Sequence, residues 1–594
     1  MLSYRKLAMR VLGHPLHTGG IDSPRPASQR AAAFILTAAM LTTLAAPAFA
    51  KTWYIENGNI TVKAGKIEGT NKVSQGETTD EKDTDTVITN RDKDTASSHT
   101  VTINANGKND KVEVTLKDVN IEANSGPALT SKGDVTLTLK GENHLTGGNG
   151  GSYGGDGIGS SSGGLTISGG TVNAAGGSGS SGGSGIYSVS GDVTISGGTV
   201  NANGGDSKDG GSGGYGISSS SLTISGGEND SLTAQGGSGA NGISSSGSLT
   251  ISGGTVTANG DDGGRGISSS GSVTISGGST VTANGGSGTI SGGDGIWSGG
   301  GVTISGGSTV TANGGNGGSL VGGDGIRSGG GLTVSDGTVT AKGGNGDSKD
   351  GYGGDGIRSG GVVTISGNTV NAAGGYGGKV GGYGICSFDR VAISGGTVEA
   401  AGGNGSTGGG SGIYSSVIDL SGSLELTAKA GSPNGRALSQ NGSELKLDDI
   451  KDKLGPGAKV TATDANGETK QVSIPRPVEP EESSSSSDGG SAAPSAPASP
   501  LPGLTVTDKD GQRISYTSTQ SGNTLTVCVG RFTASFRISL AALRQLRAEG
   551  IETITFQTVL CSTTLSVDEL LAMGGEDAEA VLTHRFTDSS LTVG

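Results

Sequence analysis

Thr-Ile-Ser-Gly-Gly (Thr166–Gly170) is the stretch that decides the fold of this 594-residue chain, because it recurs unchanged along the sequence. A second marker, Gly-Ile, keeps pace with it, and successive Gly-Ile pairs lie 24 to 31 residues apart. A repeat of this length is typical of solenoids, in which each unit buries its apolar face against its neighbours. The further unchanged copies are Thr194–Gly198, Thr223–Gly227, Thr250–Gly254, Thr274–Gly278 and Thr303–Gly307.

One repeat unit contains short segments in which β-branched apolar residues alternate with small polar ones. This period of two is the pattern of a strand with one buried face, so Val193 and Ile195 are expected to point inward and Thr194 and Ser196 outward. The Gly-Gly pairs supply corners where other residues would clash. We therefore predict an all-β chain, a right-handed parallel β-helix solenoid with a small C-terminal α+β domain. A disordered Gly/Ser linker is the alternative, but such linkers lack periodic Val and Ile.

Composition shifts along the chain predict six segments. We expect two helices in the last of them, at Leu540–Glu549 and after the capping box that begins at Ser566. An N-terminal cap is expected from a hairpin of Trp53–Ile55 with Asn59–Val62, followed by a charged loop at Gly69–Ser98. The segments are a signal peptide (1–50), an N-terminal cap with early coils (51–146), the Gly-rich repeat β-helix (147–430), a terminal coil and cap (431–478), a Pro/Ser/acidic linker (479–502) and a small α+β domain (503–594).

The first 50 residues resemble an export signal. A basic region precedes the apolar run Ala31–Ala46, and Ala48-Phe49-Ala50 offers small residues for cleavage before Lys51. A membrane anchor is the alternative, but the run is short for a span. This segment carries five basic residues and one acidic residue, so its removal takes the formal net charge from −14 to −18. We expect a protein secreted by a bacterium or held on its outer surface, with no membrane span after cleavage and no nucleic-acid partner.

The most distinctive sequence segments lie in the early coils and are Val114–Ile121, Pro127–Leu129 and Val135–Gly148. Together with the Gly-Ile and Thr-Ile-Ser-Gly-Gly coils, they resemble a family of secreted clostridial proteins known as carbohydrate-binding domain proteins. The resemblance covers roughly residues 100–430. It implies a β-helix of polysaccharide-lyase shape, binding of plant polysaccharides such as pectin, calcium binding in some members, and little or no lyase activity.

The residue after each Gly-Ile pair should point outward, because the Ile points inward. In three consecutive coils this residue is Trp297, Arg327 and Arg358. An indole face stacks on a sugar ring, and an arginine fork grips a carboxylate, so this stripe predicts a site for an acidic sugar chain along the solenoid axis. Tyr352 and Tyr383 lie in loops of the same coils and widen the surface. Unrelated residues on a permissive outer face are the alternative.

Asp294, Asp324 and Asp355 each stand two residues before one of these isoleucines. Stacked carboxylates repel one another unless a cation lies between them, and calcium is the cofactor that this predicts. The alternative is that each Asp serves as a turn residue.

Few residues in the predicted mature chain suit catalysis. None of its three histidines lies in the regular coils, and neither a Ser/His/Asp set nor zinc-ligand spacing occurs. The three cysteines do not make a disulfide scaffold, although Cys528 and Cys561 could pair. We therefore expect a non-catalytic binder of an acidic, pectin-like extracellular polysaccharide, with calcium as the cofactor that assists binding. The alternatives are an adhesin or structural stalk, and a lyase in which Asp-bound Ca²⁺ and an Arg base act on the sugar.

Overall fold

A computed structural model describes residues 50–105, 107 and 110–475, and, between 503 and 593, all residues except 509–511, 515, 522, 530–532, 559–561, 574–577 and 586–587. The predicted linker (479–502), Cys561 and all of the predicted signal peptide except Ala50 lie outside the described residues. The chain divides into two compact units, Met1–Val478 and Glu479–Gly594. Each unit is described by itself below.

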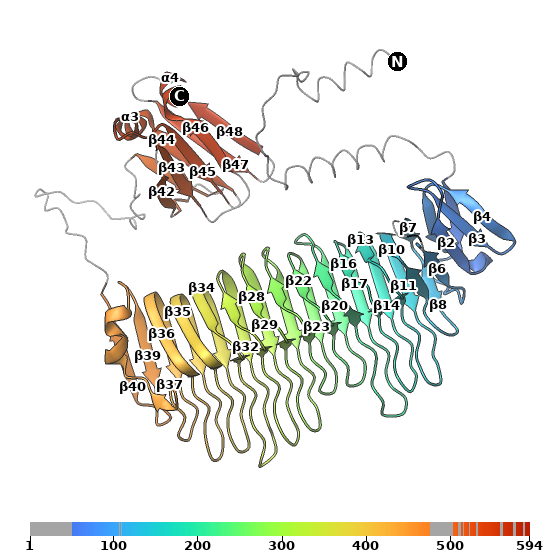
Figure 1. Ribbon diagram of the computed structural model, residues 1–594, viewed down its shortest axis with the longest axis horizontal. Coiled ribbons are helices and arrows are strands. Elements are labelled where there is room, and N and C mark those ends of the chain that lie inside the picture. The colour runs from blue at the N-terminus through green and yellow to red at the C-terminus, as the bar shows by residue number, and fades with distance from the viewer. Residues whose placement is uncertain are drawn as a thin grey trace, which may run out of the picture. The chain divides into compact units, whose positions relative to one another are not determined.

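The first unit is a parallel β-solenoid of about 15 turns, which confirms the predicted fold class. Each regular coil contains three short strands, for example β21 (Ile243–Ser245), β22 (Leu249–Ile251) and β23 (Thr255–Asn259). Each strand pairs in parallel with its counterpart in the next coil, so three sheets run along the solenoid (Figure 1). Residues one repeat apart in the sequence thereby become direct neighbours.

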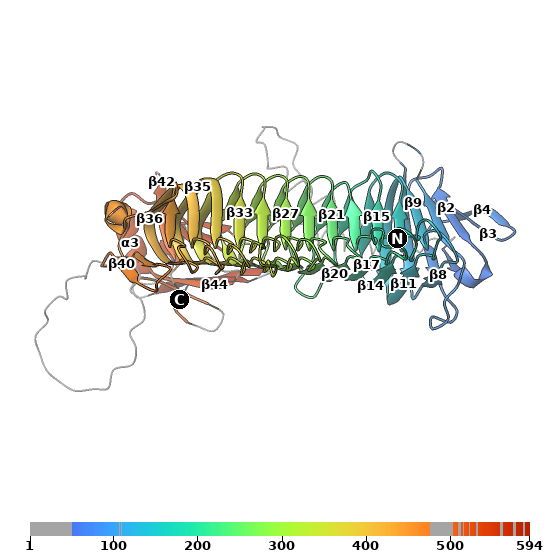
Figure 2. The same cartoon turned by 90° about the horizontal axis from the view of Figure 1, so that it is seen from below.

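The first sheet contains the Gly-Ile strands and is seen in Figure 2 as the row that includes β15, β21, β27 and β33. Before this row, β2 (Ile60–Ala64), β6 (Val101–Asn104) and β9 (Leu129–Lys132) pair in this order and lead to β12, and after it follow β35 (Ile385–Ala401), β36 (Ile413–Lys429) and β37 (Leu438–Gln440). Its regular strands are β12 (Ile158–Ser160), β15 (Ile186–Ser188), β18 (Ile217–Ser219), β21, β24 (Ile267–Ser269), β27 (Ile296–Ser298), β30 (Ile326–Ser328) and β33 (Ile357–Ser359).

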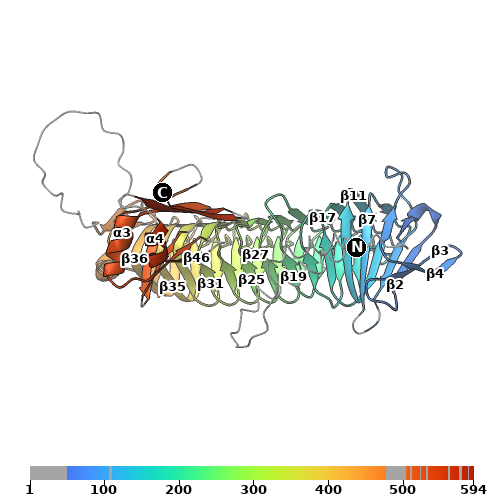
Figure 3. The same ribbon diagram turned by 90° about the horizontal axis from the view of Figure 1, so that it is seen from above.

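The second sheet contains the Thr-Ile-Ser strands, several of which are labelled in Figure 3, and the third contains the Thr-Val-x-Ala strands. The second sheet includes β13 (Leu165–Ser168), β16 (Val193–Ile195), β19 (Leu222–Ile224), β22, β25 (Val273–Ile275), β28 (Val302–Ile304) and β31 (Leu332–Val334). The third includes β14 (Thr171–Ala175), β17 (Thr199–Asn203), β20 (Ser231–Gln235), β23, β26 (Thr280–Asn284), β29 (Ser308–Asn313) and β32 (Gly337–Lys342). The last strands are longer, and β34 (Val363–Ala373), β35 (Ile385–Ala401) and β36 (Ile413–Lys429) continue around the corners between sheets.

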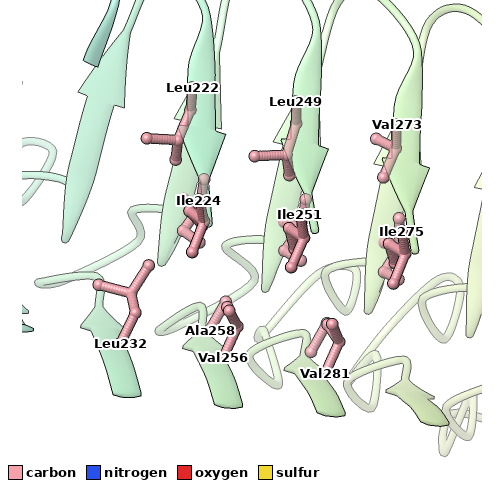
Figure 4. Close-up of a cluster of buried hydrophobic side chains, with 14 of the residues drawn as sticks. Leu222, Ile224, Leu232, Leu249, Ile251, Val256, Ala258, Val273, Ile275 and Val281 are labelled. Atoms are coloured by element: carbon pink, nitrogen blue, oxygen red, sulfur yellow. The ribbon is translucent and has the colours of Figure 1, made fainter. Parts of the chain in front are cut away.

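The core consists of columns of like aliphatic side chains (Figure 4). Ile224, Ile251 and Ile275 form one such column, and at most 4% of each side chain is exposed. The second sheet turns into the third at the Gly-Gly pairs, where Gly277 and Gly278 adopt φ values of +68° and +70°. Residues with a Cβ rarely adopt this conformation, which explains why the motif ends in glycines.

The N-terminal cap differs from the predicted hairpin. β1 (Lys51–Tyr54) pairs in parallel with β5 (Thr86–Thr89), whereas β2 (Ile60–Ala64) pairs with β3 (Asn71–Gln75). The segment expected to be a charged loop thus contains β3, β4 (Thr78–Asp83) and β5, so that prediction was wrong. Alternating Lys, Thr and acidic residues suit a half-exposed cap hairpin, because its outer face meets water and its charges discourage edge-to-edge pairing.

The early coils follow as predicted, in slightly longer strands. At the other end, a 3₁₀ helix (Leu447–Lys453) and the antiparallel pair of β39 with β40 close the solenoid. These elements are β6 (Val101–Asn104), β7 (Lys111–Lys117), β8 (Asn120–Glu122), β9 (Leu129–Lys132), β10 (Asp134–Lys140), β11 (Glu142–Thr146), β37 (Leu438–Gln440), β38 (Ser443–Glu444), β39 (Lys459–Thr463) and β40 (Thr469–Ser473).

The described residues of the second unit form two four-stranded sheets and two helices. The helix α3 (Leu540–Ala548) lies at the predicted place, and the side chain of Ser539 caps it by accepting a hydrogen bond from the Ala542 amide. The helix α4 (Val567–Met573) follows Ser566, whose hydroxyl accepts from the Glu569 amide as the capping box predicts. The sheets are β41 (Leu504–Thr507), β44 (Ala534–Ser539), β47 (Glu579–Arg585) and β48 (Asp588–Val593), and β42 (Thr517–Ser521), β43 (Thr524–Cys528), β45 (Thr553–Gln557) and β46 (Ser562–Ser566). None of the helices in the described part of the chain is long and apolar enough to cross a membrane.

Replacing Ile251 by Ala tests the stacked core. Ile251 is fully buried between Ile224 and Ile275, so its truncation should lower the free energy of unfolding of the solenoid by about 2–4 kcal/mol. Urea unfolding followed by circular dichroism measures this loss. Thr250→Ala, at the neighbouring outward position, should change stability by less than about 0.5 kcal/mol. Equal effects of the two substitutions would contradict the inward orientation of Ile251.

Candidate functional site

The predicted stripe lies on three adjacent strands of the first sheet. Trp297 on β27 is paired with Arg327 on β30, which is paired with Arg358 on β33. The repeat thus brings these three residues together as expected. The next residue of the column, Cys386, was expected to point into solvent but is only 1% exposed.

A groove of about 470 Å³ runs beside the first sheet and includes only part of the stripe. Arg327 and Arg358 line it, whereas Trp297, Tyr352 and Tyr383 do not. The remaining lining comes from the residues just before the first-sheet strands and from the loops that precede them: Gly239, Asn241, Gly263, Gly264, Arg265, Ser291, Gly292, Gly293, Asp294, Val321, Gly322, Gly323 and Asp324.

Because many lining residues are glycines, the backbone itself forms much of the groove surface. A Cβ added to Gly293 would collide with the carbonyl oxygen of Gly264, and one added to Gly323 would collide with that of Gly293. Successive coils therefore stack backbone on backbone here, and a ligand can approach the main chain closely. The sequence pattern Gly-Gly-Asp-Gly-Ile, at Gly292–Ile296 and again at Gly322–Ile326, marks this part of the groove.

The three predicted metal ligands form a hydrogen-bonded ladder. Oδ1 of Asp294 accepts the backbone N–H of Asp324 at 2.9 Å, and Oδ1 of Asp324 accepts that of Asp355 at 2.7 Å. The ladder continues when Oδ1 of Asp355 accepts the N–H of Tyr383 at 2.7 Å. Each carboxylate therefore accepts a backbone hydrogen bond from the following coil. This role resembles that of a turn residue, which was the alternative to metal binding.

Two arginines neutralise the ends of this ladder. The Nε atom of Arg265 donates to Oδ2 of Asp294 at 3.2 Å, and Nη1 of Arg358 donates to Oδ2 of Asp355 at 3.4 Å. The carboxyl group of Asp324 lies between these pairs and is 6% exposed. Burial, reinforced by the negative charges of Asp355 and Asp294, raises the pKa of Asp324 to about 8, so this carboxyl group is largely protonated at neutral pH.

The aromatic residues of the prediction have other neighbours. The guanidinium of Arg265 lies 4.5 Å from the centroid of the Trp297 ring, a cation–π contact that places Arg265 over that ring. Tyr383 stacks on Tyr414 with ring centroids 5.0 Å apart. Tyr352 is 43% exposed and is bridged in parallel to Val321, which lines the groove.

Arg327 differs from the other two arginines of the groove. Its side chain is exposed, and its guanidinium forms no ion pair with any of the described residues, although it lines the groove between two acidic positions. Arg265 was missed by the sequence analysis. Arg265 lies two residues before Ile267, and Asp294 lies two residues before Ile296. Because Ile267 and Ile296 are paired, this spacing places Arg265 beside Asp294, and the sequence could therefore have indicated the ion pair.

Within the described residues, no group of three His, Cys, Asp or Glu side chains could hold a metal ion. Binding of calcium at Asp294, Asp324 and Asp355 stays a prediction, and each of these residues already uses one oxygen in the ladder. No protein-family profile, no curated protein and no solved structure matches this chain.

Replacing Asp324 by Asn tests the charge state of the ladder. The native state holds the Asp324 proton at pH values where the unfolded chain has lost it, so the native state loses stability as pH rises from about 4 to about 8. Asn keeps an acceptor for the Asp355 amide but cannot ionise. The variant should therefore be more stable than the parent at pH 8, by about 1–4 kcal/mol, and gain little at pH 4.

Thermal unfolding at pH 4, 6 and 8 measures this difference. Asp336→Asn is the matched control, because Asp336 is exposed on a neighbouring coil and its replacement should not change the pH profile. A parent protein whose stability rises between pH 4 and pH 8 relative to Asp324→Asn would show that Asp324 is ionised in the native state.

Proposed function

We propose that the groove binds an acidic extracellular polysaccharide without cleaving it. The observation that carries this proposal is the guanidinium of Arg327, which lies in an open groove along the solenoid axis and forms no ion pair with the residues that the structure describes. An arginine fork recognises a carboxylate through two parallel hydrogen bonds, which is the geometry that a uronic acid offers.

The charges of the groove support an anionic ligand, although the whole chain is acidic. Asp294 is paired with Arg265, Asp355 is paired with Arg358, and Asp324 is largely protonated at neutral pH. Among the described residues, Arg327 forms no ion pair, although its positive charge helps to lower the pKa of Asp355.

The shape of the groove supports a linear polymer. Its lining comes from at least four consecutive coils, and neighbouring strands lie about 4.8 Å apart, so equivalent polar groups recur along the axis. Val321 on the wall, with exposed Tyr352 bridged to it, offers apolar contacts for the CH faces of sugar rings. Trp297 supports Arg265 rather than offering a bare stacking face, because the guanidinium covers its ring.

The resemblance to secreted clostridial carbohydrate-binding proteins and the export signal expected at residues 1–50 agree with a ligand outside the cell. Where calcium assists binding, Asp294, Asp324 and Asp355 would hold it, and it would supply positive charge for an acidic sugar. Two alternatives to this proposal remain. In a lyase, an arginine would remove a proton from the bound uronate. In a structural stalk, the groove would bind no ligand.

Replacing Arg327 by Ala tests the proposal. The mature chain should be retained on polygalacturonate in affinity electrophoresis and should pass a neutral dextran gel unretarded. Loss of one charge-assisted contact should weaken retention about tenfold or more, since such a contact contributes roughly 1.5–3 kcal/mol. Trp297→Ala should weaken it less, because the Trp297 ring acts through Arg265.

The control variant is Arg390→Ala, an exposed arginine outside the groove lining, which should bind like the parent. Repeating the assay with EDTA separates calcium-assisted from calcium-independent binding. Unsaturated product absorbing in the ultraviolet would identify a lyase. Absence of retention on every acidic polysaccharide, with and without Ca²⁺, would favour a structural stalk and contradict the proposal.

A further inference from the structure

Asp83, at the end of β4 in the N-terminal cap, is a buried carboxylate with several donors. Its side chain is completely inaccessible to solvent. Oδ2 accepts a hydrogen bond from Nε1 of Trp53 at 2.7 Å, and Oδ1 accepts one from the backbone nitrogen of Asp85 at 3.1 Å. Oδ1 also accepts one from the backbone nitrogen of Lys51 at 3.2 Å.

These donors are all uncharged in the unprocessed chain. None of the ion pairs formed among the described residues includes Asp83. The ε-ammonium of Lys51 points elsewhere, 2.7 Å from Oε2 of Glu81 and 4.2 Å from the centroid of the Trp53 ring. A buried carboxylate without a counter-ion is costly, so this arrangement leaves a place for one positive charge beside Oδ1.

The sequence supplies a candidate for that charge at the same atom. Ala48-Phe49-Ala50 predicts cleavage between Ala50 and Lys51, and β1 begins at Lys51. Ala50 is exposed, so the bond before β1 lies at the surface of the cap. We propose that the α-ammonium group created at Lys51 by export processing forms an ion pair with Asp83, and that this pair holds β1 on the solenoid more firmly in the mature protein than the neutral amide does in the unprocessed chain.

The chemistry is hydrolysis by a membrane-bound signal peptidase of the export pathway. Water adds across the amide bond, Ala50 leaves with the new carboxylate, and Lys51 keeps the nitrogen, which takes up a proton at neutral pH. The neutral N–H that faced Asp83 becomes a cationic donor at the same position. A hydrogen bond between charged partners is roughly twice as strong as one between neutral partners.

The position of β1 explains why this contact matters. Lys51 to Tyr54 pair with Thr86 to Thr89 of β5, and β1 has no other parallel partner among the described strands. An end strand of a solenoid frays most easily, because it is held from one side only. An anchor at its first residue therefore protects the whole cap after export. This inference rests on the predicted cleavage site and does not depend on polysaccharide binding.

Hydrogen exchange followed by mass spectrometry tests the proposal on two forms that both end at Gly594, one starting at Lys51 and one extended by the native residues Pro47–Ala50. Backbone amides of Trp53–Ile55 should exchange about tenfold more slowly in the form that starts at Lys51. Asp83→Asn should abolish this difference between the two forms, because the amide cannot form the ion pair. The secreted protein itself should have Lys51 as its N-terminal residue.

Lys51→Ala is the matched control, since it removes the ε-ammonium but keeps the α-ammonium. The difference between the two forms should survive this substitution. The proposal is overturned if both forms exchange equally, if the difference persists in Asp83→Asn, or if it disappears in Lys51→Ala. A secreted protein that begins at another residue would overturn it as well, even if the Asp83→Asn variant failed to fold.

Discussion

Every part of the solenoid depends on in-register stacking of successive coils. A coil offers only a few aliphatic side chains to the core, and each contributes roughly 1.5–3 kcal/mol when buried. Its backbone amides find their acceptors on the neighbouring coil, as the hydrogen bonds from Ile267 to Gly295 and from Ile296 to Gly325 illustrate. A single coil is therefore unstable, and the fold exists only because each coil covers the next.

Stacking also brings like polar residues together, with mixed consequences. Asn259, Asn284 and Asn313 form a favourable column, because Nδ2 of Asn284 donates to Oδ1 of Asn259 and Nδ2 of Asn313 donates to Oδ1 of Asn284. The aspartate ladder is less favourable, because carboxyl groups of successive coils repel one another. Ion pairs with Arg265 and Arg358, together with a proton on Asp324, reduce that repulsion. The charge pattern of the groove thus results from the same in-register stacking of coils that forms the core.

The sequence was sufficient to predict the columns but not the contacts within them. Periodic Val, Ile and Gly give the strand register directly, so the adjacency of Trp297, Arg327 and Arg358 followed from spacing alone. Spacing does not determine where a long side chain turns, and the contact of Arg265 with Trp297 involves residues 32 positions apart on different coils. The burial of the aspartates was missed for a similar reason, since an Asp beside glycine corners is expected in solvent. The cap was mispredicted because β3 and β4 lack the apolar alternation that identifies strands.

Departures from the repeat, rather than the repeat itself, separate the candidate site from the rest of the solenoid. The stripe column contains Ser218, Ser244 and Ser268 in the coils before Trp297, and these small residues add neither charge nor an aromatic face. The change to Trp and Arg coincides with the run of Asp294, Asp324 and Asp355 in the neighbouring column, and the groove extends from these coils back to Gly239. A consensus coil must satisfy only stacking, which any small outward residue allows. Coils that carry long charged side chains on the same face have a property that stacking does not require, and this is the reason for our proposal that they recognise a ligand.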